Sequence, residues 1–348
     1  MDGAQAPAAA TPPASTAPLL QVTDLRKHFA LKREQLFVPP ATVKAVDGVS
    51  FDVAPGETLG IVGESGCGKS TTARLVMHLI QPDAGRIVVE GEAIDGTSPA
   101  SLTALRRRVQ MVFQDSYASL NPRLTVADSI AFGPSHHGIS REAALRRARD
   151  LLGTVGLEPS QFAGRYPHQL SGGQRQRINC ARALAMQPKL LILDEAVSAL
   201  DKSVEAQMLN LLGDLKTRFG LTYVFISHDL NVVRYVSNRV LVMYLGRVAE
   251  VGPVADIYRA PRHPYTQALL ASRPSMDPEI RLERSPLTGD PPNPVDPPSG
   301  CLFRTRCPHA EAVCASRAPA LAGPAEGTAH RVACHMADAG SGHSRAGS

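Results

Sequence analysis

The sequence predicts an α/β fold in which helices cover a largely parallel β-sheet. Between Leu19 and about Val254, short aliphatic runs suited to buried strands alternate with helix-forming segments, a pattern typical of layered α/β domains. A glycine-rich turn follows one aliphatic run, and acidic residues or a histidine follow two others. Because the carboxyl ends of parallel strands meet at one edge of a sheet, these residues predict a ligand site at that edge.

The chain divides into an α/β domain with a helical insertion and a C-terminal extension. Residues 1–18 and 339–348 are almost all small or polar, and we expect both tails to be disordered. Residues 19–254 form the predicted α/β domain, which helix-forming sequence interrupts at about 116–180. From 255 to 338 the chain is rich in proline and cysteine, which predicts a small, loop-rich module with little apolar core of its own.

Composition indicates a soluble globular protein. The 348 residues are 43% hydrophobic and 20% charged. No uncharged apolar run approaches the ~20 residues that span a bilayer, and no signal-peptide pattern is present, so we expect any membrane role to depend on partners. The net charge of +5 is spread along the chain, and its short arginine clusters fit solvated helix faces better than a nucleic-acid surface.

Residues Gly63 to Ser70 fit the phosphate-binding pattern G-x-x-x-x-G-K-S. The aliphatic run Leu59–Val62 precedes them and helix-compatible sequence follows, which is the strand, loop and helix order of such a site. Backbone N–H groups of a glycine-rich loop can converge on phosphates, assisted by the helix dipole. We expect Lys69 to contact the β- and γ-phosphates and Ser70 to bind Mg²⁺. The predicted nucleotide-binding residues here are Gly63, Ser65, Gly66, Cys67, Gly68, Lys69, Ser70 and Thr71.

Two further apolar runs bring reactive residues to the same edge. Leu190–Leu193 is followed by Asp194 and Glu195, and Thr222–Ile226 is followed closely by His228. A carboxylate at a strand end suits Mg²⁺, which makes Asp194 the predicted metal ligand and leaves Glu195 to polarise the attacking water. A histidine after a strand is often a helix cap or a surface residue, but the repeated pattern favours a γ-phosphate sensor for His228. In this order, the motifs predict a nucleotide hydrolase.

The segment Leu170–Gln174, Leu-Ser-Gly-Gly-Gln, is the most specific motif in the chain. Ser171 suits a helix N-cap, and the two glycines leave the first amides of that helix open to a phosphate. With the nucleotide motifs on either side, this segment resembles the signature of ABC transporter ATPases. The resemblance implies a RecA-like core with an inserted helical subdomain and an antiparallel β subdomain. It also implies that a second ATPase subunit, in a head-to-tail dimer, holds the ATP bound by Ser171, Gly172, Gly173 and Gln174.

Single residues elsewhere are similar to other motifs of that family. Gln114 matches the Q-loop glutamine, which by this resemblance binds Mg²⁺ and the attacking water and senses the transmembrane partner. Asp201 matches the D-loop, which communicates across the dimer, and His228 matches the switch histidine. Phe29 is the candidate for the ring that stacks on adenine, with a place in the hydrophobic core as the alternative. The resemblance assigns catalysis to Glu195, His228, Gln114 and Lys69.

Three further segments resemble the dipeptide and oligopeptide importer branch of the family: Tyr117–Arg123, Tyr166–His168 and His263–Leu270. The long stretch between Phe29 and Val43 resembles the second of the two paired ATPases of that branch. The resemblance therefore implies a heterodimer at the cytoplasmic face of the membrane, with two transmembrane permease subunits and, indirectly, a solute-binding protein. It implies import of di- or oligopeptides, with nickel or metal chelates and glutathione as alternative cargoes.

Four of the six cysteines lie close to the C-terminus: Cys301, Cys307, Cys314 and Cys334. Four thiolates in a reducing compartment suit Zn²⁺ or an iron–sulfur cluster. Their spacing, C-x5-C-x6-C-x19-C, matches neither a zinc ribbon nor a ferredoxin run. Some members of the importer branch with similar tails are understood to hold a [4Fe–4S] cluster. The resemblance thus favours that cluster over Zn²⁺ and over unmetallated thiols or disulfides.

Two other functions are compatible with an ATPase of this type. ABC ATPases of translation usually join two ATPase units in one chain, and those of DNA repair insert long heptads between their motifs. This sequence has one P-loop and no such heptads. A redox-responsive regulator would use the cysteines as its main feature and ATP as a switch. The sequence therefore predicts an ATP-hydrolysing subunit that energises peptide import.

Overall fold

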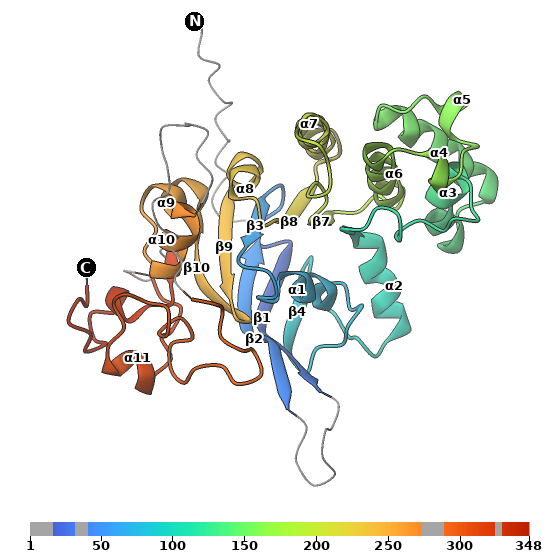
Figure 1. Cartoon of the computed structure of the whole chain (residues 1–348). Coiled ribbons are helices and arrows are strands. Elements are labelled where there is room, and N and C mark those ends of the chain that lie inside the picture. The colour runs from blue at the N-terminus through green and yellow to red at the C-terminus, as the bar shows by residue number, and fades with distance from the viewer. Residues whose placement is uncertain (1–16, 32–40, 273–288, 324–328, 348) are drawn as a thin grey trace, which may run out of the picture.

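A computed structural model describes residues 17–31, 41–272, 289–323 and 329–347. Within them, two β-sheets lie between a helical lobe and a C-terminal segment (Figure 1). Of the N-terminal tail that is predicted to be disordered, residues 1–18, all but the last two lie outside the described residues. So does most of the long stretch after Phe29 that resembles the second paired ATPase.

A seven-stranded sheet forms the centre of the domain. Five adjacent strands, which reach one edge of the sheet, are parallel, and the two strands at the other edge are antiparallel. Every residue of the three strands in the middle of the parallel group is buried, as expected for parallel strands covered on both faces. The predicted buried strands are therefore confirmed. In order, the strands are β11 (Arg331–Val332), β10 (Arg247–Pro253), β9 (Arg239–Tyr244), β3 (Thr58–Val62), β8 (Thr222–Ile226), β7 (Leu190–Asp194) and β6 (Val109–Val112).

A four-stranded antiparallel sheet lies beside the first. Along its long central strand, Leu20, Val22 and Leu25 are buried and most residues between them are exposed, so one face of the sheet covers the core. This sheet matches the antiparallel β subdomain that the resemblance implies. Its strands are β2 (Thr42–Val53), β1 (Leu20–Ala30), β4 (Ala84–Val89) and β5 (Glu92–Ala93).

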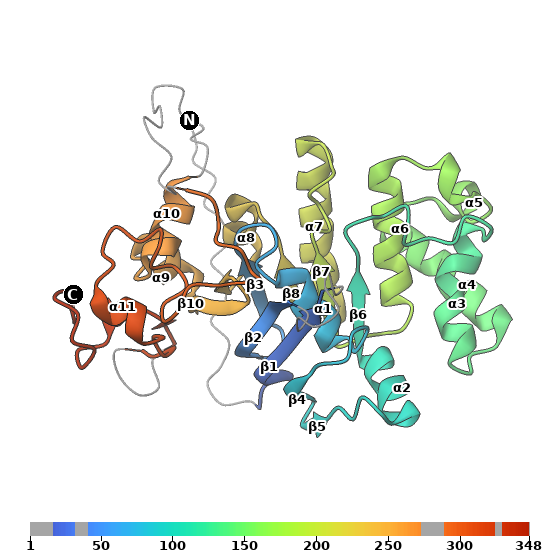
Figure 2. The ribbon, with the colours of Figure 1, turned by 60° about the horizontal axis from the view of Figure 1, so that its bottom comes forward.

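The helical insertion forms a lobe at the end of the molecule opposite the C-terminal segment (Figure 2). Its longer helices begin at hydroxyl caps, Thr125, Ser140 and Ser171, which accept backbone N–H groups of the first turn. The lobe contains α3 (Val126–His136), α4 (Arg141–Thr154), α5 (Pro159–Phe162), the 3₁₀ turn η1 (Pro167–Gln169) and α6 (Gly172–Leu184). The α/β core carries α1 (Lys69–Val76), α2 (Pro99–Arg108), α7 (Lys202–Phe219) and α8 (Leu230–Val236).

The C-terminal extension, residues 255–338, shares the core of the α/β domain. Phe303 is buried, with its ring centroid 5.4 Å from that of Tyr244 and 5.5 Å from that of Tyr265, and strand β11 pairs with β10. The extension has few large apolar residues, so it packs those it has against the neighbouring domain. Helix α9 (Val254–Arg259) leads into it, and it contains α10 (Pro264–Ala271), α11 (Ala312–Ser316) and the 3₁₀ turn η2 (His335–Ala337).

The C-terminal tail differs from its prediction of disorder, because residues 339–347 pack against the extension. His343 is buried and its Nε2 lies 2.8 Å from the carbonyl oxygen of His309. Arg317 donates to the carbonyl of Ser341 over 3.0 Å. The prediction of disorder rested on composition alone. Composition does not reveal these hydrogen bonds, because their partners lie far away in the sequence and are brought close only by the fold. In the described part of the chain, no helix combines the length and apolarity that crossing a membrane requires.

Candidate nucleotide-binding site

The loop between β3 and α1 has a backbone that requires glycine at two positions. Gly63 has φ +148° and Gly68 has φ +105°, backbone angles that L-residues with a side chain rarely adopt. A Cβ at either position would lie 2.3 Å from a backbone carbonyl oxygen, that of Met243 for Gly63 and that of Ala45 for Gly68. The glycines therefore allow a tight loop whose amides approach the start of α1, where a phosphate is favoured.

Lys69 lies folded across this loop. Its Nζ donates to the carbonyl of Gly63 over 2.7 Å and to that of Glu64 over 3.0 Å, and the side chain is buried. The ammonium group is thus held at the place where phosphates of a nucleotide would bind. Burial also raises the pKa of the neighbouring Cys67 thiol, so that this thiol stays neutral beside the lysine.

Ser70 and Asp194 meet at the carboxyl ends of the strands, as predicted. The hydroxyl of Ser70 donates to Oδ1 of Asp194 over 2.8 Å. Burial raises the pKa of Asp194, because desolvation disfavours the charged carboxylate. A hydroxyl and a buried carboxylate form a donor set that fits Mg²⁺. A bound Mg²⁺ would supply positive charge beside the β- and γ-phosphates.

Glu195, Gln114 and His228 come together next to these residues. Nε2 of Gln114 donates to Oε2 of Glu195 over 2.8 Å, and Nδ1 of His228 lies 3.6 Å from the same oxygen. Glu195 has φ +48°, and its backbone N–H donates to the carbonyl of Ile226 over 3.0 Å. The sheet edge therefore holds one carboxylate among groups that can orient it, which is the geometry needed to align a water with a phosphoryl group.

A cavity of about 340 Å³ joins the glycine-rich loop to Gln114, Glu195 and His228. Phe29 is 38% exposed and pairs across β1 and β2 with Val43, which lines this cavity. Phe29 thus lies one strand away from it. Several lining residues carry no local motif and were missed by the sequence reasoning: Val43, Lys44, Ala45, Leu245, Gly246 and Pro294.

The signature residues lie elsewhere. Ser171 and Gln174 cap α6 reciprocally, with the hydroxyl accepting from the N–H of Gln174 over 3.3 Å and the side chain of Gln174 accepting from Ser171 N–H over 3.0 Å. Among the described residues, those that line the cavity include neither residues 171–174 nor Asp201, which precedes α7. Their predicted roles toward a partner's nucleotide remain predictions.

The four C-terminal cysteines gather around one small cavity, which His309 and His335 also line. All four are free thiols, and burial raises the pKa of Cys301 to about 11. Across the described ranges, however, no group of three or more His, Cys, Asp or Glu side chains is placed so that it could hold a metal ion. The four cysteines therefore line one cavity without forming a metal site among the described residues, and the metal itself remains a prediction.

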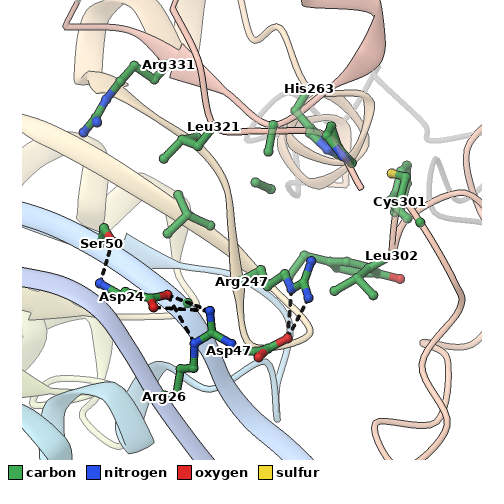
Figure 3. A pocket seen from close by; sticks show the side chains of 18 residues that line it. Asp24, Arg26, Asp47, Ser50, Arg247, His263, Cys301, Leu302, Leu321 and Arg331 are labelled. Atoms are coloured by element: carbon green, nitrogen blue, oxygen red, sulfur yellow. Dashed lines mark hydrogen bonds and ion pairs between the residues drawn. The ribbon is translucent and has the colours of Figure 1, made fainter. Parts of the chain in front are cut away.

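Two other hollows adjoin the site. A cavity of about 460 Å³ lies between the antiparallel sheet and the C-terminal extension, with the ion pairs Asp47–Arg247 and Asp24–Arg26 at its wall (Figure 3). A groove of about 730 Å³ lies beside the helical lobe and is lined by Leu79, Phe113 and Phe132. Gln114 lines both this groove and the nucleotide cavity.

The chain is similar to ABC transporter proteins over most of its length. The family described as "ABC transporter" matches residues 46–198, and the family described as "Oligopeptide/dipeptide transporter, C-terminal region" matches residues 249–314. A probable peptide ABC transporter ATP-binding protein of Sinorhizobium fredii, y4tS, is 51% identical over 91% of this chain and 90% of its own length. This chain belongs to the ABC transporter ATPases.

A second relative and a solved structure are also similar to this chain. The oligopeptide transport ATP-binding protein AppF of Bacillus subtilis is 48% identical over 91% of this chain and 97% of its own. Among solved structures, the ATP-binding cassette MJ0796, a dimer in a post-hydrolysis state bound to ADP and Pi, has a TM-score of 0.60 and 28% identity. The alignment covers 68% of this chain and 98% of the MJ0796 chain. ATP hydrolysis is therefore the activity of this family member.

Proposed function

We propose that this ABC ATPase energises the import of di- and oligopeptides. The observation that carries the proposal is the C-terminal region, since residues 249–314 match a family described for oligopeptide and dipeptide transporters. Relatives named as peptide or oligopeptide transport ATP-binding proteins align with 91% of the chain at 48% and 51% identity. The C-terminal extension therefore distinguishes this chain from an ABC ATPase of general type.

Hydrolysis proceeds through positioning and charge compensation. Glu195 orients the attacking water, with its carboxylate held by Gln114 at 2.8 Å. Lys69 offsets negative charge on the β- and γ-phosphates, and Ser70 and Asp194 hold Mg²⁺. In the dimer, the signature amides of a second ATPase subunit complete the site, and this chain's Ser171, Gly172 and Gly173 do the same for the partner's ATP.

Transmembrane permease subunits dock in the groove beside the helical lobe. Phe132 is 54% exposed and Leu79 is 49% exposed, and such exposed apolar surface in a groove suits a short permease helix. Gln114 lines the groove and also contacts Glu195. A permease helix that moves Gln114 therefore changes how the water-orienting carboxylate is held. Through the permeases, the ATPase lies peripherally at the cytoplasmic face of the membrane.

The four C-terminal cysteines hold a [4Fe–4S] cluster, with Zn²⁺ as the competing metal. Support comes from four free thiols around one cavity, a complete ligand number for either metal. Protein purified without oxygen is expected to contain iron and acid-labile sulfide in nearly equal amounts. Stoichiometric zinc without sulfide would contradict the cluster and assign a zinc site.

Uptake of labelled peptides tests the transport function. Cells that lack this chain are complemented with the native protein or with its Glu195→Gln form, and uptake of di- and oligopeptides is measured. The proposal predicts that only the native protein restores uptake. Peptide uptake that does not depend on this chain would contradict the proposal. Restored uptake of a nickel chelate or of glutathione, without peptide uptake, would assign that compound as the cargo in place of peptides.

A further inference from the structure

The phosphate-binding loop contains a carboxylate that no role in ATP binding explains. Residues 63–70 include one acidic side chain, Glu64. A negative charge in a loop that receives a triphosphate opposes binding through like-charge repulsion. Something must therefore neutralise Glu64 or turn it away from the phosphates.

A residue of the C-terminal extension supplies this neutralisation. Arg306 makes a two-point ion pair with Glu64, Nη1 to Oε2 at 2.7 Å and Nη2 to Oε1 at 3.1 Å. The Arg306 side chain is only 5% exposed. A planar guanidinium bound through two hydrogen bonds fixes direction as well as charge.

The backbone of Glu64 is held by a second residue of the extension. The N–H of Glu64 donates to the hydroxyl of Tyr265 over 2.9 Å. Tyr265 is fully buried, and its ring lies 5.5 Å from that of Phe303. Phe303 and Arg306 belong to the same short segment between two of the cysteines, so the side chain and the backbone of Glu64 are both held from the extension.

We propose that Arg306 and Tyr265 are positioning residues of the nucleotide site, which neutralise and orient Glu64 so that the phosphate-binding loop accepts ATP. Neither residue lines the nucleotide cavity; each acts through Glu64. The inference rests on ATP binding at this loop and not on the cargo, so failure of the peptide-import proposal would leave it standing.

ATP affinity of the purified full-length chain tests the proposal in a double-mutant cycle. Arg306→Ala leaves Glu64 as an uncompensated charge beside the triphosphate, and we expect it to raise the Kd for ATP by roughly tenfold or more. Glu64→Gln removes that charge. The double variant is therefore expected to bind ATP nearly as tightly as Glu64→Gln alone.

Two further variants serve as controls. Arg304→Ala changes a nearby arginine that hydrogen-bonds to Ser299 and is expected to leave the Kd for ATP unchanged. Arg306→Lys keeps the charge but loses the two-point geometry, and its Kd is expected between those of the native protein and Arg306→Ala. If Arg306→Ala does not fold, the same cycle is run with Arg306→Lys.

Two results would overturn the proposal. One is an unchanged Kd for ATP in a folded Arg306→Ala protein. The other is a weakened affinity that Glu64→Gln does not restore, because a loss that is independent of Glu64 would mean that Arg306 stabilises the fold without positioning the loop. Thermal unfolding of each variant without nucleotide separates loss of folding from loss of affinity.

Discussion

Asp194 shows at the scale of one residue how the site is prepared for a cation. It is buried, it accepts a hydrogen bond from Ser70, and burial raises its pKa. A carboxylate that is costly to ionise in the folded protein lowers stability wherever it remains charged. We expect this buried carboxylate to bind the cation that accompanies ATP.

Asp194→Asn is expected to separate stability from function. Without nucleotide, removal of the buried charge is expected to raise the melting temperature, because burial disfavours the charged carboxylate. The same substitution abolishes Mg²⁺-dependent ATP turnover, because an amide is a poor ligand for Mg²⁺. Calorimetry without nucleotide and a turnover assay with Mg²⁺ check both parts. A melting temperature below that of the native protein would contradict the account.

The site residues differ in how far sequence could predict them. Lys69, Ser70, Asp194 and Glu195 belong to contiguous motifs at strand ends, so the parallel sheet alone brings them together. Lys44 and Pro294 line the same cavity without any motif, because their positions depend on how a separate sheet and the extension pack against the loop. Local patterns cannot encode that packing.

At the scale of elements, α10 begins at an unusual cap. Nδ1 of His263 accepts the N–H of Tyr265 over 3.0 Å, and the imidazole is buried. Burial lowers the pKa of His263 from 6.5 to about 4. The folded protein thus keeps this ring neutral and able to accept the capping hydrogen bond at neutral pH.

This cap predicts a loss of stability in acid. The unfolded chain takes up a proton at His263 near pH 6.5 and the folded chain only near pH 4, so protonation favours the unfolded state between these values. The free energy of unfolding should therefore fall as pH is lowered from 6.5 to 4. His263→Asn keeps an acceptor for the cap and does not titrate, so its decrease over this range should be smaller. Denaturant titrations at several pH values test this, and equal pH dependence in both proteins would refute it.

The sequence predicted individual strands correctly where both faces of the strand are buried. Strands β3, β7 and β8 are predominantly apolar because both faces of each strand are covered. Residues 339–347 were predicted to be disordered, yet His343 is buried against the extension. In that tail, a few hydrogen bonds to residues distant in sequence determine the structure. The amino-acid composition of the tail does not predict these hydrogen bonds.

At the scale of the whole molecule, the C-terminal extension is part of the ATPase rather than an appendage. Arg306 and Glu64 are 242 positions apart in sequence, yet they form a partly buried ion pair at the nucleotide loop. Phe303 and strand β11 anchor the same extension to the main sheet. The feature that connects the chain to peptide transport therefore also contacts the loop that binds ATP.

We propose that this chain hydrolyses ATP through a water molecule that Glu195 orients. The most direct test measures ATP binding and turnover of the native protein and of Glu195→Gln, each assembled with its partner subunits, with the surface variant Glu142→Gln as a control. The account predicts that Glu195→Gln binds ATP about as tightly as the native protein but turns over at least ~100-fold more slowly, while Glu142→Gln behaves as native. Undiminished turnover in Glu195→Gln would contradict it.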